Sequence, residues 1–218
     1  MQELKDRIVK EGKVLPGNII KVDGFLNHRI DTELMDHIAE EFGKHFNMDE
    51  VSLILTAEAS GIALSAIVAQ HFHKPMIFAK KAKSDNIEGG LYQSDIFSYT
   101  YKKKVTLLVS KEWMSSDDKV LIIDDFMANG EAMRGLCDLV NAAGATLVGI
   151  GCAVEKGFQG GGDRLRAVGV NLKSLAIIES AEPGNIVFRD EDCVSLRTHL
   201  PPLFVYECID RFIKGGTL

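Results

Sequence analysis

Two adjacent carboxylates followed by a turn of small residues are the most chemically informative feature of the sequence. In VLIIDDFMANGEAM, residues 120–133, an apolar strand ends in Asp124 and Asp125, and a turn then opens a helix. The turn consists of Ala128, Asn129, Gly130, Glu131 and Ala132. Its backbone N–H groups and the positive end of the helix dipole suit a phosphate, and glycine allows close approach. Carboxylates repel phosphate and suit hydroxyl groups or a cation. A ribose 5-phosphate would satisfy both parts of the pattern, with its phosphate in the turn and its hydroxyl groups on the carboxylates.

A second turn of the same kind follows another apolar run. The segment VSLILT is followed by AEASG, in which Ala59, Ser60 and Gly61 offer further backbone donors at a helix start. Lys80, Lys81 and Lys83 then form a local basic cluster in a protein with 31 acidic and 25 basic side chains. Such a cluster is either a partner for a polyanion or a solvated run of charge. For Lys102–Lys104 we favour the solvated alternative.

Alternation of strands and helices positions these turns. Apolar runs predict strands at 51–56, 75–79, 105–110, 119–124, 145–155 and 174–178. Helical patterns occupy 32–46 with Asp31 as N-cap, a stretch ending near His71, 130–143 with Gly144 as C-cap, and 163–169. The order predicts an α/β fold with a central parallel sheet flanked by helices, and ligands of such sheets bind at the carboxyl ends of the strands. Residues 80–104 are polar with little helical period, so we expect a functional loop or lid there. The first 30 or so residues would pack on this domain or cap it.

Composition excludes several classes of protein. The chain has 218 residues, 46% of them hydrophobic, and a formal net charge of −6, which argues against nucleic acid as a partner. No apolar run approaches the roughly 18 residues of a membrane span, and the charged N-terminus has no signal-peptide core, so we expect a cytoplasmic protein. Cys137, Cys152, Cys193 and Cys208 have no zinc-site spacing and indicate reduced thiols. Neither a metal-binding histidine motif nor a serine hydrolase elbow is present.

The segment 120–133 resembles the phosphoribosyl-pyrophosphate (PRPP) motif of the type I phosphoribosyltransferases. Many members have Thr or Ser in place of Asn129, and the ANG form is similar to the branch of the family that uses xanthine. Further resemblance lies in IKVDGFLNHRID (20–31), EASGIA (58–63) and VEKGFQ (154–159). The matches run to about residue 190, so we expect a phosphoribosyltransferase domain at 1–192 and a tail of unknown role at 193–218. Where this chain has Glu131, the branch commonly has Gln. The role of the Glu131 side chain is therefore left open.

The resemblance implies roles for the residues above. Ala128–Ala132 would hold the 5′-phosphate, and Asp124 and Asp125 would contact the ribose hydroxyls as catalytic residues. Ala59, Ser60 and Gly61 would form the pyrophosphate loop, with Lys80 and Lys81 as its basic pair. It also implies Mg²⁺ held mainly by PRPP rather than by the protein, a flexible lid loop over the site, a small hood built from the two termini, and a homodimer.

For the base, the resemblance indicates Ile20, Asn27, Lys156 and Phe158. A lysine can donate to a purine oxo group but cannot accept from an exocyclic amine, so Lys156 favours an oxopurine over adenine. Ile20 would be an apolar wall, and Phe158 either stacks on the base or is a core aromatic. The implied activity is transfer of the phosphoribosyl group to xanthine. The alternatives are hypoxanthine or guanine as the base, or a PRPP-sensing regulatory binding protein.

Overall fold

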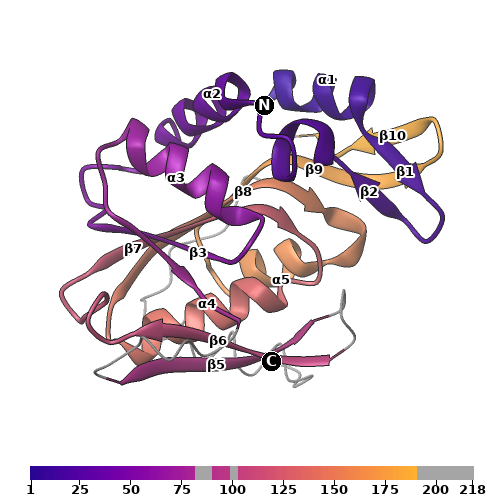
Figure 1. Ribbon diagram of the computed structural model, residues 1–218. Helices are drawn as coiled ribbons and strands as arrows, with labels where there is room; N and C mark the ends of the chain where they lie inside the picture. Colours follow the sequence, from indigo (N-terminus) through magenta and orange to yellow (C-terminus); the bar gives the residue numbers. More distant parts are fainter. Residues whose placement is uncertain (82–89, 99–102, 191–218) are drawn as a thin grey trace.

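A computed structural model describes residues 1–81, 90–98 and 103–190; residues 82–89, 99–102 and 191–218 lie outside the description (Figure 1). The predicted tail therefore cannot be compared with the structure, and neither can Lys83, Lys102, Cys193 or Cys208. Within the described ranges, no helix is both long and apolar enough to cross a membrane.

A six-stranded sheet forms the centre of the molecule, in the order β10-β9-β8-β7-β3-β4. The strands are β3 (Leu53–Ala57), β4 (Met76–Ala79), β7 (Lys119–Met127), β8 (Thr146–Lys156), β9 (Leu172–Glu182) and β10 (Asn185–Phe188). Five run parallel, as predicted, whereas β10 pairs antiparallel with β9, so the sheet is mixed. Every residue of β3 is buried, which explains why its sequence is a continuous apolar run.

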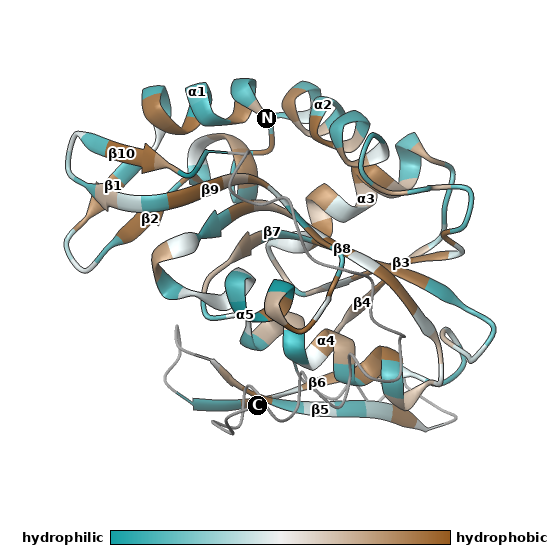
Figure 2. Cartoon of the chain, turned by 180° about the vertical axis from the view of Figure 1, so that it is seen from behind, coloured by the Kyte–Doolittle hydropathy of each residue, from teal (hydrophilic) through white to brown (hydrophobic). Residues whose placement is uncertain are grey.

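Helices cover both faces of the sheet, as expected for an α/β fold (Figure 1). The helices α1 (Gln2–Glu11), α2 (Thr32–Gly43) and α3 (Gly61–His71) pack their apolar residues into one core cluster. On the other face, α4 (Glu131–Ala142) and α5 (Gly161–Ala167) contribute to a second cluster, which includes the buried thiols of Cys137 and Cys152. Hydrophilic and hydrophobic stretches alternate along α1 and α4 (Figure 2), as one-sided burial requires.

The predicted N-cap of α2 is confirmed, whereas α2 ends at Gly43 rather than at residue 46 and the C-cap of α4 is Ala143 rather than Gly144. The Asp31 side chain accepts a hydrogen bond from the Leu34 N–H at 3.2 Å, which makes it the N-cap of α2. Gly144 adopts a positive φ of 71° one residue beyond the C-cap of α4. The Ala145 N–H then donates to the Val140 carbonyl at 3.1 Å, as in a helix ended by a left-handed glycine.

The prediction of a loop over 80–104 is wrong for its described part. Residues Leu91–Ser98 form β5, which pairs antiparallel with β6 (Lys103–Ser110), and this hairpin lies against α4 (Figure 1). Lys80 joins the hairpin to the end of β4 through two backbone hydrogen bonds with Leu108, of 2.9 and 2.8 Å. The lid itself stays a prediction, because 82–89 and 99–102 lie outside the described residues.

The first 30 residues contain more regular structure than the sequence indicated. Besides α1, they form a small hairpin of β1 (Lys13–Leu15) and β2 (Ile19–Lys21) and a π-helical turn, η1 (Asp23–Asn27). The strand β7 is also longer than predicted, because Phe126 and Met127 continue its pairing with β8. Asp124 and Asp125 therefore lie inside the strand, near its carboxyl end, rather than at its last position.

A buried carboxylate ties α5 to the two strands beside it. Glu155 of β8 has no solvent exposure, and it binds the Arg166 guanidinium through Oε1 at 3.0 Å and Oε2 at 2.6 Å. The Ser174 hydroxyl of β9 donates to Oε2 at 2.5 Å. A side chain at Gly162 would collide with this carboxylate. Glu155 and Arg166 therefore depend on each other, because removing one partner of a buried ion pair leaves the other charge uncompensated.

Replacing Arg166 should therefore destabilise the fold. In Arg166→Ala the buried Glu155 carboxylate loses its cation, and we expect the free energy of unfolding to fall by about 3 kcal/mol. Urea unfolding followed by circular dichroism measures the change. Lys44→Ala, which removes only exposed ion pairs to Glu40 and Glu41, is the control and should barely move the midpoint. Equal midpoints for the two variants would contradict the role given to Arg166.

Candidate active site

The Asp125 carboxylate joins three of the predicted site residues. Its Oδ2 accepts a hydrogen bond from the Asn27 amide at 2.9 Å, and its Oδ1 accepts one from the Ser60 hydroxyl at 2.8 Å. Asn27 ends η1, Ser60 precedes α3, and Asp125 belongs to β7, so the bonds connect the N-terminal segment, the second turn and the sheet. Only 1% of Asp125 is exposed. One carboxylate thus brings together three predicted site residues that are far apart in the sequence, Asn27, Ser60 and Asp125 itself.

Asp124 lies against the second turn. Its Oδ1 accepts from the Asp125 N–H at 3.1 Å, and the same oxygen and the Thr56 hydroxyl occupy the place where a side chain on Gly61 would be. The buried Thr56 hydroxyl has no hydrogen-bond partner in the described part of the chain. Burial raises the pKa of the Asp124 carboxyl well above its ordinary value, and the neighbouring Asp125 charge adds to the rise. Glycine is therefore required at position 61 because a carboxylate and a hydroxyl approach its backbone.

Two residues that were not predicted from the sequence, Arg164 and Gly161, contact the backbone of the turn at 128–132. Gly130, with φ +82°, is the N-cap residue of α4, and the Arg164 guanidinium donates to the Asn129 carbonyl at 2.8 Å. A side chain on Gly161 would collide with the backbone of Ala128 and Asn129. The turn thus lies directly on the start of α5. The run of three glycines at 160–162 was the available signal, since closely packed backbones require glycine.

The side chain of Glu131 points away from the turn, which answers the question left by the sequence. Its Oε2 accepts from the Phe97 N–H of β5 and from the Arg134 guanidinium, both at 3.3 Å. The backbone of Glu131 stays in the first turn of α4, where its N–H can contribute to a phosphate site.

The two lysines predicted to face pyrophosphate lie at the end of β4. The Lys81 N–H donates to the Glu58 carboxylate at 2.5 Å, so the basic pair lies beside the second turn. The charge of Lys81 opposes the rise in the pKa of Asp124, which is raised chiefly by burial. Lys80 is anchored by its backbone to β6. Lys81 is therefore close enough to Asp124 for its charge to act on that carboxyl.

The predicted base-binding residues have different surroundings. The Lys156 ammonium is 5.4 Å from the centre of the Phe126 ring and donates to the Asn18 carbonyl at 3.4 Å. Burial lowers the pKa of this ammonium group. Ile20 is buried in the first core cluster, and Phe158 is half-buried against it, so both have a packing role. Phe126, which sequence reasoning missed, is the aromatic ring that Lys156 contacts, and it follows Asp125 directly.

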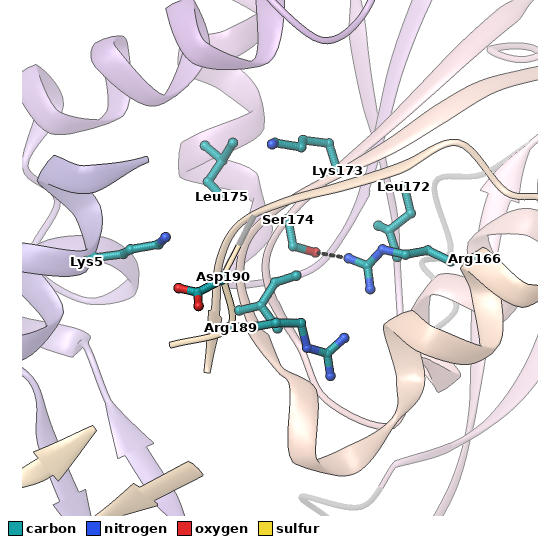
Figure 3. Close-up of a pocket in the computed structure, with 9 residues that line it drawn as sticks. Lys5, Arg166, Leu172, Lys173, Ser174, Leu175, Arg189 and Asp190 are labelled. Atoms are coloured by element: carbon teal, nitrogen blue, oxygen red, sulfur yellow. Dashed lines mark hydrogen bonds between the residues drawn. The ribbon is translucent and has the colours of Figure 1, made fainter. Parts of the chain in front are cut away.

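A separate pocket lies along β9 and contains none of the predicted site residues (Figure 3). Four cationic side chains line it, from Lys5, Arg166, Lys173 and Arg189. Arg166 is already bound to Glu155, and Arg189 binds Asp163 at 2.5 Å and Glu179 at 2.7 Å. These ion pairs indicate a structural role for the arginines.

Replacing Asp124 should change how stability depends on pH. Because the folded pKa is raised, the folded protein keeps a proton that the unfolded chain loses, so wild-type stability falls as pH rises from the ordinary value towards the folded pKa. The side chain introduced by Asp124→Asn cannot ionise, so we expect the free energy of unfolding of this variant to rise relative to that of wild type as the pH increases above the ordinary pKa of an aspartate, about 4. Urea unfolding at several pH values measures this. The exposed Asp117→Asn is the control, and parallel profiles for wild type and Asp124→Asn would refute the interpretation.

Comparison with known proteins identifies the family. The model of the phosphoribosyl transferase domain matches residues 25–176. A xanthine phosphoribosyltransferase of Bifidobacterium adolescentis is 52% identical over 192 residues, which cover 87% of this chain and all of the relative. One from Lachnoclostridium phytofermentans is 52% identical over 88% of this chain and all of the relative.

Solved structures agree on the fold. An APRTase from Giardia lamblia complexed with 9-deazaadenine superposes with a TM-score of 0.69 at 22% identity, covering 82% of this chain and 98% of that one. An adenine phosphoribosyltransferase from Rhodothermus marinus gives 0.66 at 20% identity, covering 82% of this chain and all of that one. The chain therefore belongs to the phosphoribosyl transferase domain family and has the type I phosphoribosyltransferase fold.

Proposed function

We propose that the protein transfers the 5-phosphoribosyl group of PRPP to xanthine, giving xanthosine 5′-monophosphate and pyrophosphate, as a purine salvage enzyme. The observation that carries the proposal is the Asp125 carboxylate, which Asn27 and Ser60 bind from two other elements beside the 128–132 turn. The names of the curated relatives support xanthine as the base.

The 5′-phosphate would bind the turn at the start of α4. Backbone N–H groups of Ala128–Ala132 and the helix dipole supply the attraction, and Arg164 fixes the turn through the Asn129 carbonyl. This arrangement needs no charged side chain in the turn. A phosphate bound there would direct the ribose towards β7, where the two carboxylates lie.

Asp124 and Asp125 would accept hydrogen bonds from the ribose hydroxyls. In the free protein both oxygens of Asp125 are already bonded, to Asn27 and Ser60, so ribose would share or replace these donors. The bond from the ribose C1 to pyrophosphate breaks, and the bond to a base nitrogen forms on the opposite face, with loss of the proton of that nitrogen. The nearby Asp125 carboxylate would stabilise the positive charge that develops at C1.

Pyrophosphate would leave from the second turn. Ala59, Ser60 and Gly61 offer donors at the start of α3, and Lys80 and Lys81 lie beside them at the end of β4. The leaving group carries several negative charges, and the nearby ammonium groups offset them.

The adjacent Asp124 and Asp125 side chains would suit a magnesium ion that arrives with PRPP, because Mg²⁺ prefers oxygen ligands. Within the described residues no group of three or more His, Cys, Asp or Glu side chains is arranged to hold a metal. Asp124 and Asp125 would be the nearest carboxylates and would face the ion through the ribose hydroxyls. When bound, Mg²⁺ neutralises charge on the pyrophosphate and makes it a better leaving group.

The base would lie between the N-terminal segment and β8. Lys156 would donate to an oxo group, Asn27 would offer a donor and an acceptor, and Phe126 and Phe158 would flank the ring. Homodimer formation, a cytoplasmic location and the division into a domain at 1–192 and a tail at 193–218 remain proposals that come with the family resemblance.

A base panel tests the function. Pyrophosphate release is followed with PRPP, Mg²⁺ and each purine base in turn. We expect kcat/KM to be highest for xanthine and lower for hypoxanthine and guanine. Adenine should be about 100-fold or more below xanthine, because its amine cannot accept from Lys156.

The other outcomes of the panel separate the alternatives. Highest turnover with hypoxanthine or guanine would identify the protein as a hypoxanthine/guanine enzyme, and highest turnover with adenine would refute the argument from Lys156. Binding of PRPP and of DNA without turnover of any purine would indicate a regulatory protein.

Removing the Lys156 ammonium should affect the base and spare PRPP. In Lys156→Ala we expect kcat/KM for xanthine to fall about 100-fold, because a half-buried donor to the base is lost, while the Kd of PRPP measured by calorimetry is retained. Lys173→Ala, on the neighbouring strand β9, is the control. An equal loss of PRPP affinity would contradict the role in base recognition.

A further inference from the structure

Glu131 creates an electrostatic problem at the proposed phosphate site. It occupies the first turn of α4, the helix whose N-terminus would receive the 5′-phosphate. A carboxylate is attracted to this end of a helix by the same dipole and N–H groups that attract a phosphate. A Glu131 side chain turned towards the helix start would therefore compete with the substrate and repel it.

An arginine one turn along the helix holds this side chain elsewhere. The Arg134 guanidinium donates through Nη1 to Asp138 at 2.6 Å and through Nη2 to the Asp95 carbonyl at 2.6 Å. These two bonds fix the planar group so that Nη2 also faces the Glu131 carboxylate, at 3.3 Å. The side chains of Arg134 and Glu131 are only 13% and 19% exposed, so solvent screens their attraction less than that of a surface pair.

The edge of β5 completes the arrangement. Asp95 and Phe97 are two residues apart, so their backbone groups point to the same side of the strand. Arg134 binds the carbonyl of Asp95, and Glu131 accepts from the N–H of Phe97 at 3.3 Å. The two side chains thus occupy neighbouring positions on the edge of the hairpin that lies along α4 (Figure 1). The Ser94 hydroxyl donates to Asp138 at 2.7 Å and holds the far end of the ion-pair chain.

We propose that Arg134 is a positioning residue for PRPP: it keeps the Glu131 carboxylate on the edge of β5 and out of the phosphate-binding turn. This inference rests on the proposed function. Arg134 itself contacts no substrate; it acts by deciding where a negative charge lies. Its loss frees Glu131 to turn towards the helix start, where the carboxylate opposes phosphate binding.

A double-mutant cycle tests the proposal. Arg134→Met should raise the KM of PRPP and its Kd by about tenfold, as expected for an uncompensated like charge near the site, with a smaller effect on kcat. When the same change is made in the E131Q background, the rise should shrink to about twofold or less, since no charge remains to be held away. Arg134→Lys, which retains the cation without the planar fork, should recover part of the loss.

The KM and the calorimetric Kd of PRPP are measured for wild type, Arg134→Met, Glu131→Gln, the double variant and Arg134→Lys, with thermal unfolding to establish that each is folded. An equal effect of Arg134→Met in both backgrounds would overturn the proposal, because it would mean that Arg134 merely anchors the hairpin. If wild type binds PRPP but the cycle is additive, the inference fails and the proposed function stands. If wild type neither binds nor uses PRPP, both fail.

Discussion

The hydrogen bonds to Asp125 are the interaction on which the arrangement of the site depends. A carboxylate with 1% exposure needs donors, and it takes them from Asn27 and from Ser60. Asn27 is 98 residues away in sequence and Ser60 is 65 away. The bonds therefore set the distance between the N-terminal segment, where a base would bind, and the two turns where phosphates would bind. They also form a polar network that remains satisfied when ribose is absent.

Two carboxylates near this network are each paired with an arginine. Glu155 is neutralised by Arg166, and Glu131 is held by Arg134 on the hairpin. Asp124 is different, since burial and Asp125 raise the pKa of its carboxyl and the described structure gives it little compensation. Functional sites commonly contain a buried ionisable group that lowers the stability of the free protein and can accept hydrogen bonds from hydroxyl groups of a ligand. The cost in stability is offset when a ligand supplies the missing hydrogen bonds.

Much of the fold was predictable because its signals are local. The buried strands β3, β7 and β8 are apolar runs, and α2 and α4 have clear periodicity and end residues. The helix α1 was missed because most of its residues are charged or polar and only Leu4 and Ile8 are buried. The strand β5 was missed because apolar and polar residues do not alternate along it: the polar Ser94 is buried, whereas Phe97 is exposed.

The site was predictable in a different way. The carboxylates and both turns follow from residue types, whereas Asn27 and Lys156 came from family resemblance, since no spacing rule relates residues so far apart. Arg164 acts on a backbone carbonyl of the turn, and such a contact leaves little trace in a single sequence, whereas Gly161 belongs to a visible run of three glycines. Phe126 was within the recognised segment, but its contact with Lys156 depends on how far β7 continues past Asp125.

The way in which the β5–β6 hairpin is attached has a consequence for motion. Its two strands pair with each other along their length, but among the described residues the hairpin meets the central sheet at one bridge, between Lys80 and Leu108. Its other polar attachments to α4 are side-chain bonds from residues such as Arg134 and Asp138. Ile96, Leu107 and Val109 of the hairpin are buried in the second core cluster, so opening of the hairpin has to expose part of that core. Local opening of this unit would release the first turn of α4 without disturbing the carboxylates of β7.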